Sequence, residues 1–175
     1  MTATITGLAT FAMAFFVYVL TLCPTVYVEG SGELIGAVYG LGTPHPTGYP
    51  LFCLSGRLIA LLLPFASPAY EINMASALFA AAACGALAHM LQERGVQAWV
   101  ALATGLIFAF SRTYWSQAVI AEVYGLFVLC SVLVLAASLR VGAAGPMRSR
   151  WLLLSGYIGG VAATSHLQVV LLLPS

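Results

Sequence analysis

The segment GSGELIGAVYGLGTPHPTGYPL, residues 30–51, decides how the rest of the chain can be arranged. It gathers glycines, prolines, a histidine and a glutamate between two strongly apolar stretches, and Glu29 directly precedes it. The prolines and glycine of HPTGYP, residues 45–50, predict a rigid turn rather than a continuous helix. The segment therefore predicts a polar loop between apolar parts of the chain.

The composition around this loop is that of a membrane protein. The sequence is 62% hydrophobic and 6% charged, and its mean hydropathy is +1.02, whereas roughly a quarter of the residues of an average soluble domain are charged. There is no Asp or Lys, so the charges are five Glu and six Arg. We predict an all-α, polytopic integral membrane protein. The net charge of +1 argues against nucleic acid as a partner.

A membrane-spanning helix needs about 20 apolar residues. Five stretches meet this length, the third of them when extended to an interfacial tryptophan: 5–23, 72–91, 96–115, 118–139 and 151–173. The first is read as a retained span, because it has no positive n-region and no small-residue cleavage site. The Ala/Gly/Ser-rich stretch 75–88 is predicted to be a close-packing face.

Residues 50–65 are apolar, but they are only 16 residues long and have Arg57 near the centre. Burying that arginine in hydrocarbon would cost about 2.5–3.5 kcal/mol. If the segment lies at the surface and the N-terminus is cytoplasmic, four of the six arginines fall inside, as the positive-inside rule requires: Arg94, Arg140, Arg148 and Arg150. A six-span alternative, with the N-terminus outside, also satisfies the rule but buries Arg57. We favour five spans, with interfacial helices in an outer loop over 24–68.

This topology has a consequence for function, because it places most of the ionisable side chains on the non-cytoplasmic side. They are Glu29, Glu33, His45, Arg57, Arg112, Glu122 and His166. A single polar site at one face is then possible. The rival hypothesis, a transporter or a lipid-binding membrane protein, predicts polar residues along a path across the bilayer.

Glu33 has two interpretations. We expect Ser31 to cap a helix that ends at Gly40 or Gly42 and carries Glu33 in its first turn, where a carboxylate is favoured by the helix dipole. The carboxylate is either a general base, with a pKa tuned by its surroundings, or a capping group that meets water. Glu29 is the second candidate base.

The other candidates keep similar alternatives. Arg57 and Arg112 are suited to bind a phosphate group, or they anchor the chain at the interface. Glu122, predicted about one turn inside the fourth helix, is a functional candidate or pairs with one of these arginines. His166, in the last span, either shapes the site or makes a hydrogen bond between helices. His45 is either held by the rigid turn toward a ligand or is structural. It has no second histidine at metal spacing, so no metal site is proposed.

Three blocks carry a resemblance to a known family. They are CPTVYVEGSGELIGAVYGLGTPHPTGYPLFCLSGRL, INMASALFAA and FSRTYWSQAVIAEVYGLF, followed by a histidine in the last predicted helix. Together they resemble the DUF2723 family of polytopic proteins, which is similar to the GT-C glycosyltransferases and has an endoplasmic-reticulum protein O-mannosyltransferase among its eukaryotic relatives.

The resemblance implies a GT-C-like, inverting glycosyltransferase with juxtamembrane helices in its first outer loop. Such enzymes pass a sugar from a polyprenyl-phosphate carrier to a protein or glycan acceptor on the non-cytoplasmic face, and an outer-loop carboxylate is the base. No cofactor is implied. We expect a bacterial inner membrane, and we expect that residues 1–175, a single membrane domain, are the N-terminal part of a longer protein.

One position departs from the family pattern. Relatives commonly have an acidic residue directly before Ser-Gly-Glu, and this sequence has Gly30 there. Glu33 matches the pattern, and Glu29 lies one position earlier than expected. A non-catalytic member of the family is therefore a third hypothesis.

Overall fold

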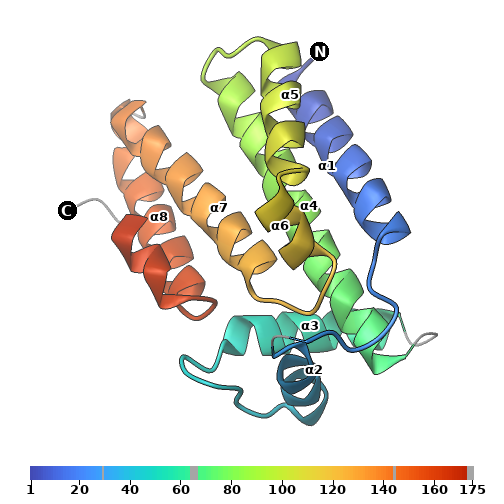
Figure 1. Ribbon diagram of the computed structural model, residues 1–175. Coiled ribbons are helices and arrows are strands. Elements are labelled where there is room, and N and C mark those ends of the chain that lie inside the picture. The colour runs from blue at the N-terminus through green and yellow to red at the C-terminus, as the bar shows by residue number, and fades with distance from the viewer. Residues whose placement is uncertain (29, 64–66, 144, 173–175) are drawn as a thin grey trace.

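The chain is built of helices. The computed structural model describes residues 1–28, 30–63, 67–143 and 145–172, and those residues contain no strand (Figure 1). In chain order the elements are α1 (Ala3–Leu20), α2 (Ser31–Gly40), α3 (Pro50–Leu62), α4 (Pro68–Glu93), α5 (Ala98–Ala109), α6 (Arg112–Ala118), α7 (Tyr124–Ala143), the 3₁₀ helix η1 (Gly145–Met147), α8 (Arg148–Ala163) and the 3₁₀ helix η2 (Leu167–Leu172).

Three of the described helices are long and apolar enough to cross a membrane. They are α1, α4 and the part of α7 from Tyr124 to Gly142. α5 is apolar but has 12 residues, and α6 continues from it along the bundle (Figure 1). The predicted class, an all-α integral membrane protein, is confirmed, while the count of five spans stays a prediction.

α4 is the central helix of the bundle and packs against α1, α3, α5 and α7. Its small residues allow a close approach to α1, since a Cβ added at Gly85 would lie 2.8 Å from the carbonyl oxygen of Gly7 and 2.9 Å from Cβ of Phe11. The predicted close-packing face is confirmed, because most residues of the stretch 75–88 are buried.

The long helices alternate in direction, so α1 ends, α4 and α7 begin, and α8 ends at the same end of the bundle (Figure 1). α2 and α3 lie across this end, which we call the α2–α3 end. The backbone N–H of Leu51 donates to the carbonyl of Thr164 at 3.4 Å and so joins the start of α3 to the end of α8.

α3 confirms the helix predicted at 50–65, although it ends at Leu62. Proline at its first position suits a helix start. Leu54, Leu58 and Leu61 form an exposed apolar face at helical spacing. That this face meets the membrane surface stays a prediction.

α2 ends at Gly40 as expected, but its start differs from the prediction. Gly30 is the N-cap residue, with φ of +90°, and among the described residues no side chain is seen to cap the helix. Ser31 is fully buried, and its hydroxyl donates to the carbonyl of Ala121 at 3.2 Å. The expectation that Ser31 caps α2 is therefore wrong, because its side chain is used to join α2 to the loop between α6 and α7.

Candidate functional site

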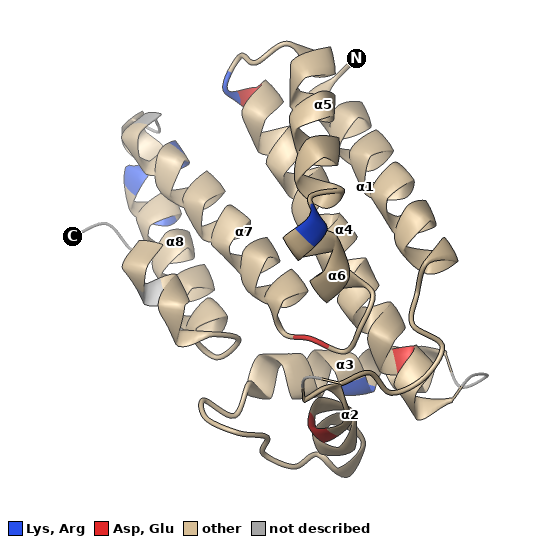
Figure 2. Cartoon of the chain, viewed as in Figure 1, with Lys and Arg blue, Asp and Glu red and all other residues tan. Residues whose placement is uncertain are grey.

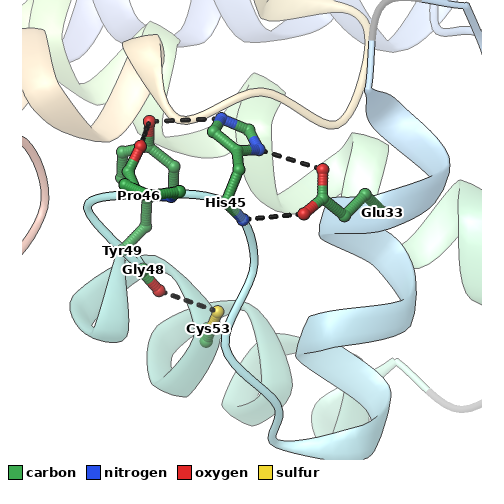
Figure 3. Close-up of polar contacts among 6 residues, drawn as sticks. All are labelled: Glu33, His45, Pro46, Gly48, Tyr49 and Cys53. Atoms are coloured by element: carbon green, nitrogen blue, oxygen red, sulfur yellow. Dashed lines mark hydrogen bonds and ion pairs between the residues drawn. The ribbon is translucent and has the colours of Figure 1, made fainter.

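Glu33 and His45 form the polar centre of the α2–α3 end. The two carboxylate oxygens of Glu33 accept hydrogen bonds from the backbone N–H of His45, at 2.7 Å, and from its ring Nδ1, at 3.0 Å (Figure 3). These two bonds hold the pKa of Glu33 below its usual range. Both side chains are about half exposed, so solvent reaches the pair.

Tyr49 lies on the other side of the His45 ring, and sequence analysis did not single it out. Its hydroxyl is 3.3 Å from Nε2 of His45 and 3.3 Å from the carbonyl oxygen of Pro46 (Figure 3). Burial raises the pKa of Tyr49, and the charges of Tyr124, Glu122 and Glu33 act in the same direction. The only signal in the sequence was the spacing of four residues from His45 in a rigid turn.

His166 joins this group from the far end of the chain. Its ring stacks on Tyr49, with 6.0 Å between ring centroids, and also contacts the rings of Phe127 at 5.0 Å and Tyr124 at 6.4 Å. The prediction that His166 lies within a helix over 151–173 is wrong. α8 ends at Ala163, and His166 lies in the turn before η2.

Glu122 also lies at this end, but not where it was predicted. The helix expected over 118–139 begins at Tyr124, so Glu122 is in the loop before α7 and not one turn inside the helix. The hydroxyl of Ser76 accepts a hydrogen bond from the backbone N–H of Glu122 at 3.1 Å and donates to its carbonyl at 3.2 Å. The loop is thus fixed by α4 on one side and by Ser31 of α2 on the other.

A cavity of about 620 Å³ opens between α5, α6 and α7, next to this loop. Its volume is in the range of small-molecule sites. Its lining contains both polar groups and aromatic rings and includes Phe108, Ser111, Thr113, Tyr114, Gln117, Glu122, Tyr124, Phe127 and Val128. Since Tyr124 and Phe127 also contact His166, the aromatic group around Tyr49 adjoins the cavity.

The two candidate phosphate-binding arginines are not brought together. Arg57 lies over the ring of Tyr39, with its guanidinium carbon 4.9 Å from the centroid, and the Tyr39 hydroxyl donates to the buried carboxylate of Glu71. Burial, with the neighbouring Glu71 as a further cause, raises the pKa of Tyr39 to about 12. Arg112 begins α6 and is exposed.

The charged segments show the same separation. In Figure 2 the basic segment of α6 lies apart from that of α3, whereas the acidic segments of α2, of the α6–α7 loop and of the start of α4 lie at the α2–α3 end. Glu29, the second candidate base, lies outside the described residues. Among the residues that the structure describes, no group of three His, Cys, Asp or Glu side chains is placed to hold a metal ion.

Comparison with known proteins places the chain in a family. The family model for the "Protein O-mannosyl-transferase TMEM260 N-terminal domain" matches residues 30–175. No solved structure matches the chain.

Two relatives are similar to the chain. The mouse protein O-mannosyl-transferase TMEM260 is 36% identical over 168 residues, which are 94% of this chain and 24% of the relative. The Dictyostelium discoideum protein O-mannosyl-transferase tmem260 is 29% identical over 117 residues, which are 63% of this chain and 14% of the relative. The chain thus spans about a quarter of the mouse relative's length. From the match to the family model, supported by the mouse relative, the chain belongs to the TMEM260 N-terminal domain family.

Proposed function

We propose that this chain forms the catalytic membrane part of a glycosyltransferase that passes a sugar from a polyprenyl-phosphate carrier to an acceptor hydroxyl. The names of the relatives favour mannose as the sugar and a protein as the acceptor. The GT-C-like class, the DUF2723 designation and the inverting outcome are part of the same proposal. The observation that carries it is the line of contacts from Glu33 through His45 and Tyr49 to His166, whose ring contacts Tyr124 and Phe127 in the lining of the cavity.

The reaction is written as a single displacement. The acceptor oxygen attacks the anomeric carbon, the bond from that carbon to the phosphate oxygen breaks, and the bonding pair leaves with the phosphate. The protein must supply a base for the acceptor proton, charge for the leaving phosphate and a fixed geometry for both substrates. Neither a metal ion nor an organic cofactor enters this scheme.

The residues divide between these tasks by position. The basic centre is Glu33 with its partner His45, and Glu29 is the alternative carboxylate. Glu122 lines the cavity, and His166 contacts Tyr124 and Phe127 of its lining. Both residues are proposed to position the sugar. Arg57 and Arg112 are proposed to contact the lipid phosphate, and their separation requires that they act at different positions along the carrier.

The orientation is proposed from the distribution of arginine. With the N-terminus in the cytoplasm, the ends of α4, α7 and α8 that carry four arginines face inward, in agreement with the positive-inside rule. The α2–α3 end then faces the outer side of a bacterial inner membrane. Lipid-linked sugars presented on that side would reach the cavity between α6 and α7.

The proposal is tested with the full-length protein in proteoliposomes. Labelled polyprenyl-phosphate sugars are offered together with a serine- and threonine-containing peptide, and the product is examined for a new glycosidic bond and for its anomeric configuration. We expect sugar attached to the peptide with inverted configuration. Movement of intact labelled donor across the bilayer without any new bond would instead support a transporter.

A further inference from the structure

Which atom takes the proton of the acceptor hydroxyl depends on the hydrogen bonds that the Glu33 carboxylate already makes. Its two oxygens are both bonded to His45, one to the backbone N–H and one to Nδ1. Glu33 is also in the first turn of α2, where the helix dipole favours the anion. A carboxylate stabilised in these three ways is a weak base, in agreement with its lowered pKa.

The imidazole of His45 lies between this carboxylate and the rest of the site. Figure 3 shows Glu33 and Tyr49 on opposite sides of the ring. Because Nδ1 faces a carboxylate, it carries the ring proton, and Nε2 is left as the acceptor. Nε2 points toward Tyr49, which stacks on His166. His166 in turn contacts Phe127, which lines the cavity.

The hydroxyl of Tyr49 is compatible with both protonation states of the His45 ring. It has one proton and two acceptors at 3.3 Å, Nε2 of His45 and the carbonyl oxygen of Pro46. When the hydroxyl donates to Pro46, the lone pair of Nε2 is open to a substrate hydroxyl. When His45 is protonated, Nε2–H can donate to the tyrosine oxygen without any movement of the backbone.

We infer that Nε2 of His45 accepts the proton of the acceptor hydroxyl, and that Glu33 and Tyr49 are positioning residues which hold the imidazole from its two sides. The inference rests on the proposed function and refines its basic centre. Imidazole also suits the task, since histidine is the side chain that most often transfers protons in enzymes.

The acceptor O–H bond breaks and its proton goes to Nε2, while the oxygen forms the new bond to the anomeric carbon. The phosphate leaves with the electron pair of the old bond. The imidazolium is paired through Nδ1–H with the Glu33 anion, and it loses the proton to water because half of the His45 side chain is exposed.

The test compares kcat for sugar transfer by the full-length protein and by variants at both residues. We expect His45→Ala to lower kcat about 100-fold or more, the usual contribution of a general base, and added imidazole to restore at least part of the loss. His89→Ala is the matched control, because His89 lies near the other end of α4 and contacts Glu93. It should keep kcat within a few-fold and show no response to imidazole.

Glu33 gives a second readout. If it acts through His45, Glu33→Gln lowers kcat, and the double variant is no slower than His45→Ala alone. The inference is overturned if formate restores Glu33→Ala, or if His45→Ala transfers sugar at the rate of the unaltered protein. Should the alanine variant not fold, His45→Asn replaces it, since its side-chain amide can still donate to Glu33.

These outcomes separate the two proposals. An unaltered protein that forms no glycosidic bond from any donor removes the proposed function, and the inference with it. An active protein whose histidine variants remain active removes the inference alone.

Discussion

Ser76 of α4 holds the loop that contains Glu122. The effect of Ser76→Ala on the free energy of unfolding can be worked out from its hydrogen bonds. The Ser76 hydroxyl is fully buried and makes two hydrogen bonds with the backbone of Glu122, whose exposed fraction is 9%. Ser76→Ala leaves a buried N–H and a buried C=O without this partner. Each lost bond costs about 1 kcal/mol or more, so we expect the free energy of unfolding to fall by about 2–3 kcal/mol.

The measurement is reversible unfolding in mixed micelles, followed by circular dichroism. Ser116→Ala is the matched control, because that hydroxyl is exposed and bonds only the carbonyl of Thr113 in its own helix. The control should lie within about 0.5 kcal/mol of the unaltered protein. If Ser76→Ala and Ser116→Ala are equally stable, the Ser76 hydroxyl does not fix the loop, and the argument for its position is refuted.

Three further predictions follow from packing, charge and burial. Gly85→Ala should destabilise the protein by about 1–3 kcal/mol through overpacking against α1, whereas Gly156→Ala, which meets nothing within 4 Å, should not lower stability in the same unfolding experiment. Because the folded-state pKa of Glu33 is lowered, its bond to the amide of His45 should persist above the ordinary glutamate pKa of about 4.3 and be lost as pH falls through the lowered value. Hydrogen exchange of that amide, corrected for its intrinsic rate, checks this, and protection that is already lost at or above the ordinary glutamate pKa would contradict it. Tyr39→Phe should cost about 1–3 kcal/mol, because it removes a hydrogen bond to a buried carboxylate of α4; equal unfolding free energies would exclude that role.

The sequence was sufficient to predict the class of the protein, and it also predicted helix directions that place most of the candidate site residues at the α2–α3 end. Apolar stretches and the position of four arginines set the expected directions of the helices, and these directions bring Tyr49 and His166 together although 117 residues separate them. The turn at 45–50 was also visible, because proline and glycine restrict the backbone locally.

Other features depended on tertiary contacts that periodicity does not reveal. Residues 119–123 are apolar enough to continue a helix, but buried hydroxyls of Ser31 and Ser76 hold them as a loop. The apolar run 151–173 likewise gave no sign that α8 ends before His166. The joint role of Arg57 and Arg112 was predicted from charge alone, and their separate positions in α3 and α6 could not be foreseen without the packing.

The most direct test of the account is sugar transfer by the full-length protein in proteoliposomes, compared between Glu33→Gln and Glu93→Gln. Both variants exchange a carboxylate for an amide. Glu93, however, is the last residue of α4, at the end of that helix far from the α2–α3 end, and is paired with Arg140. We predict that Glu33→Gln loses about 10-fold or more of the transfer rate while remaining folded, and that Glu93→Gln retains it. Equal rates for the two variants would contradict the placement of the active site at the α2–α3 end.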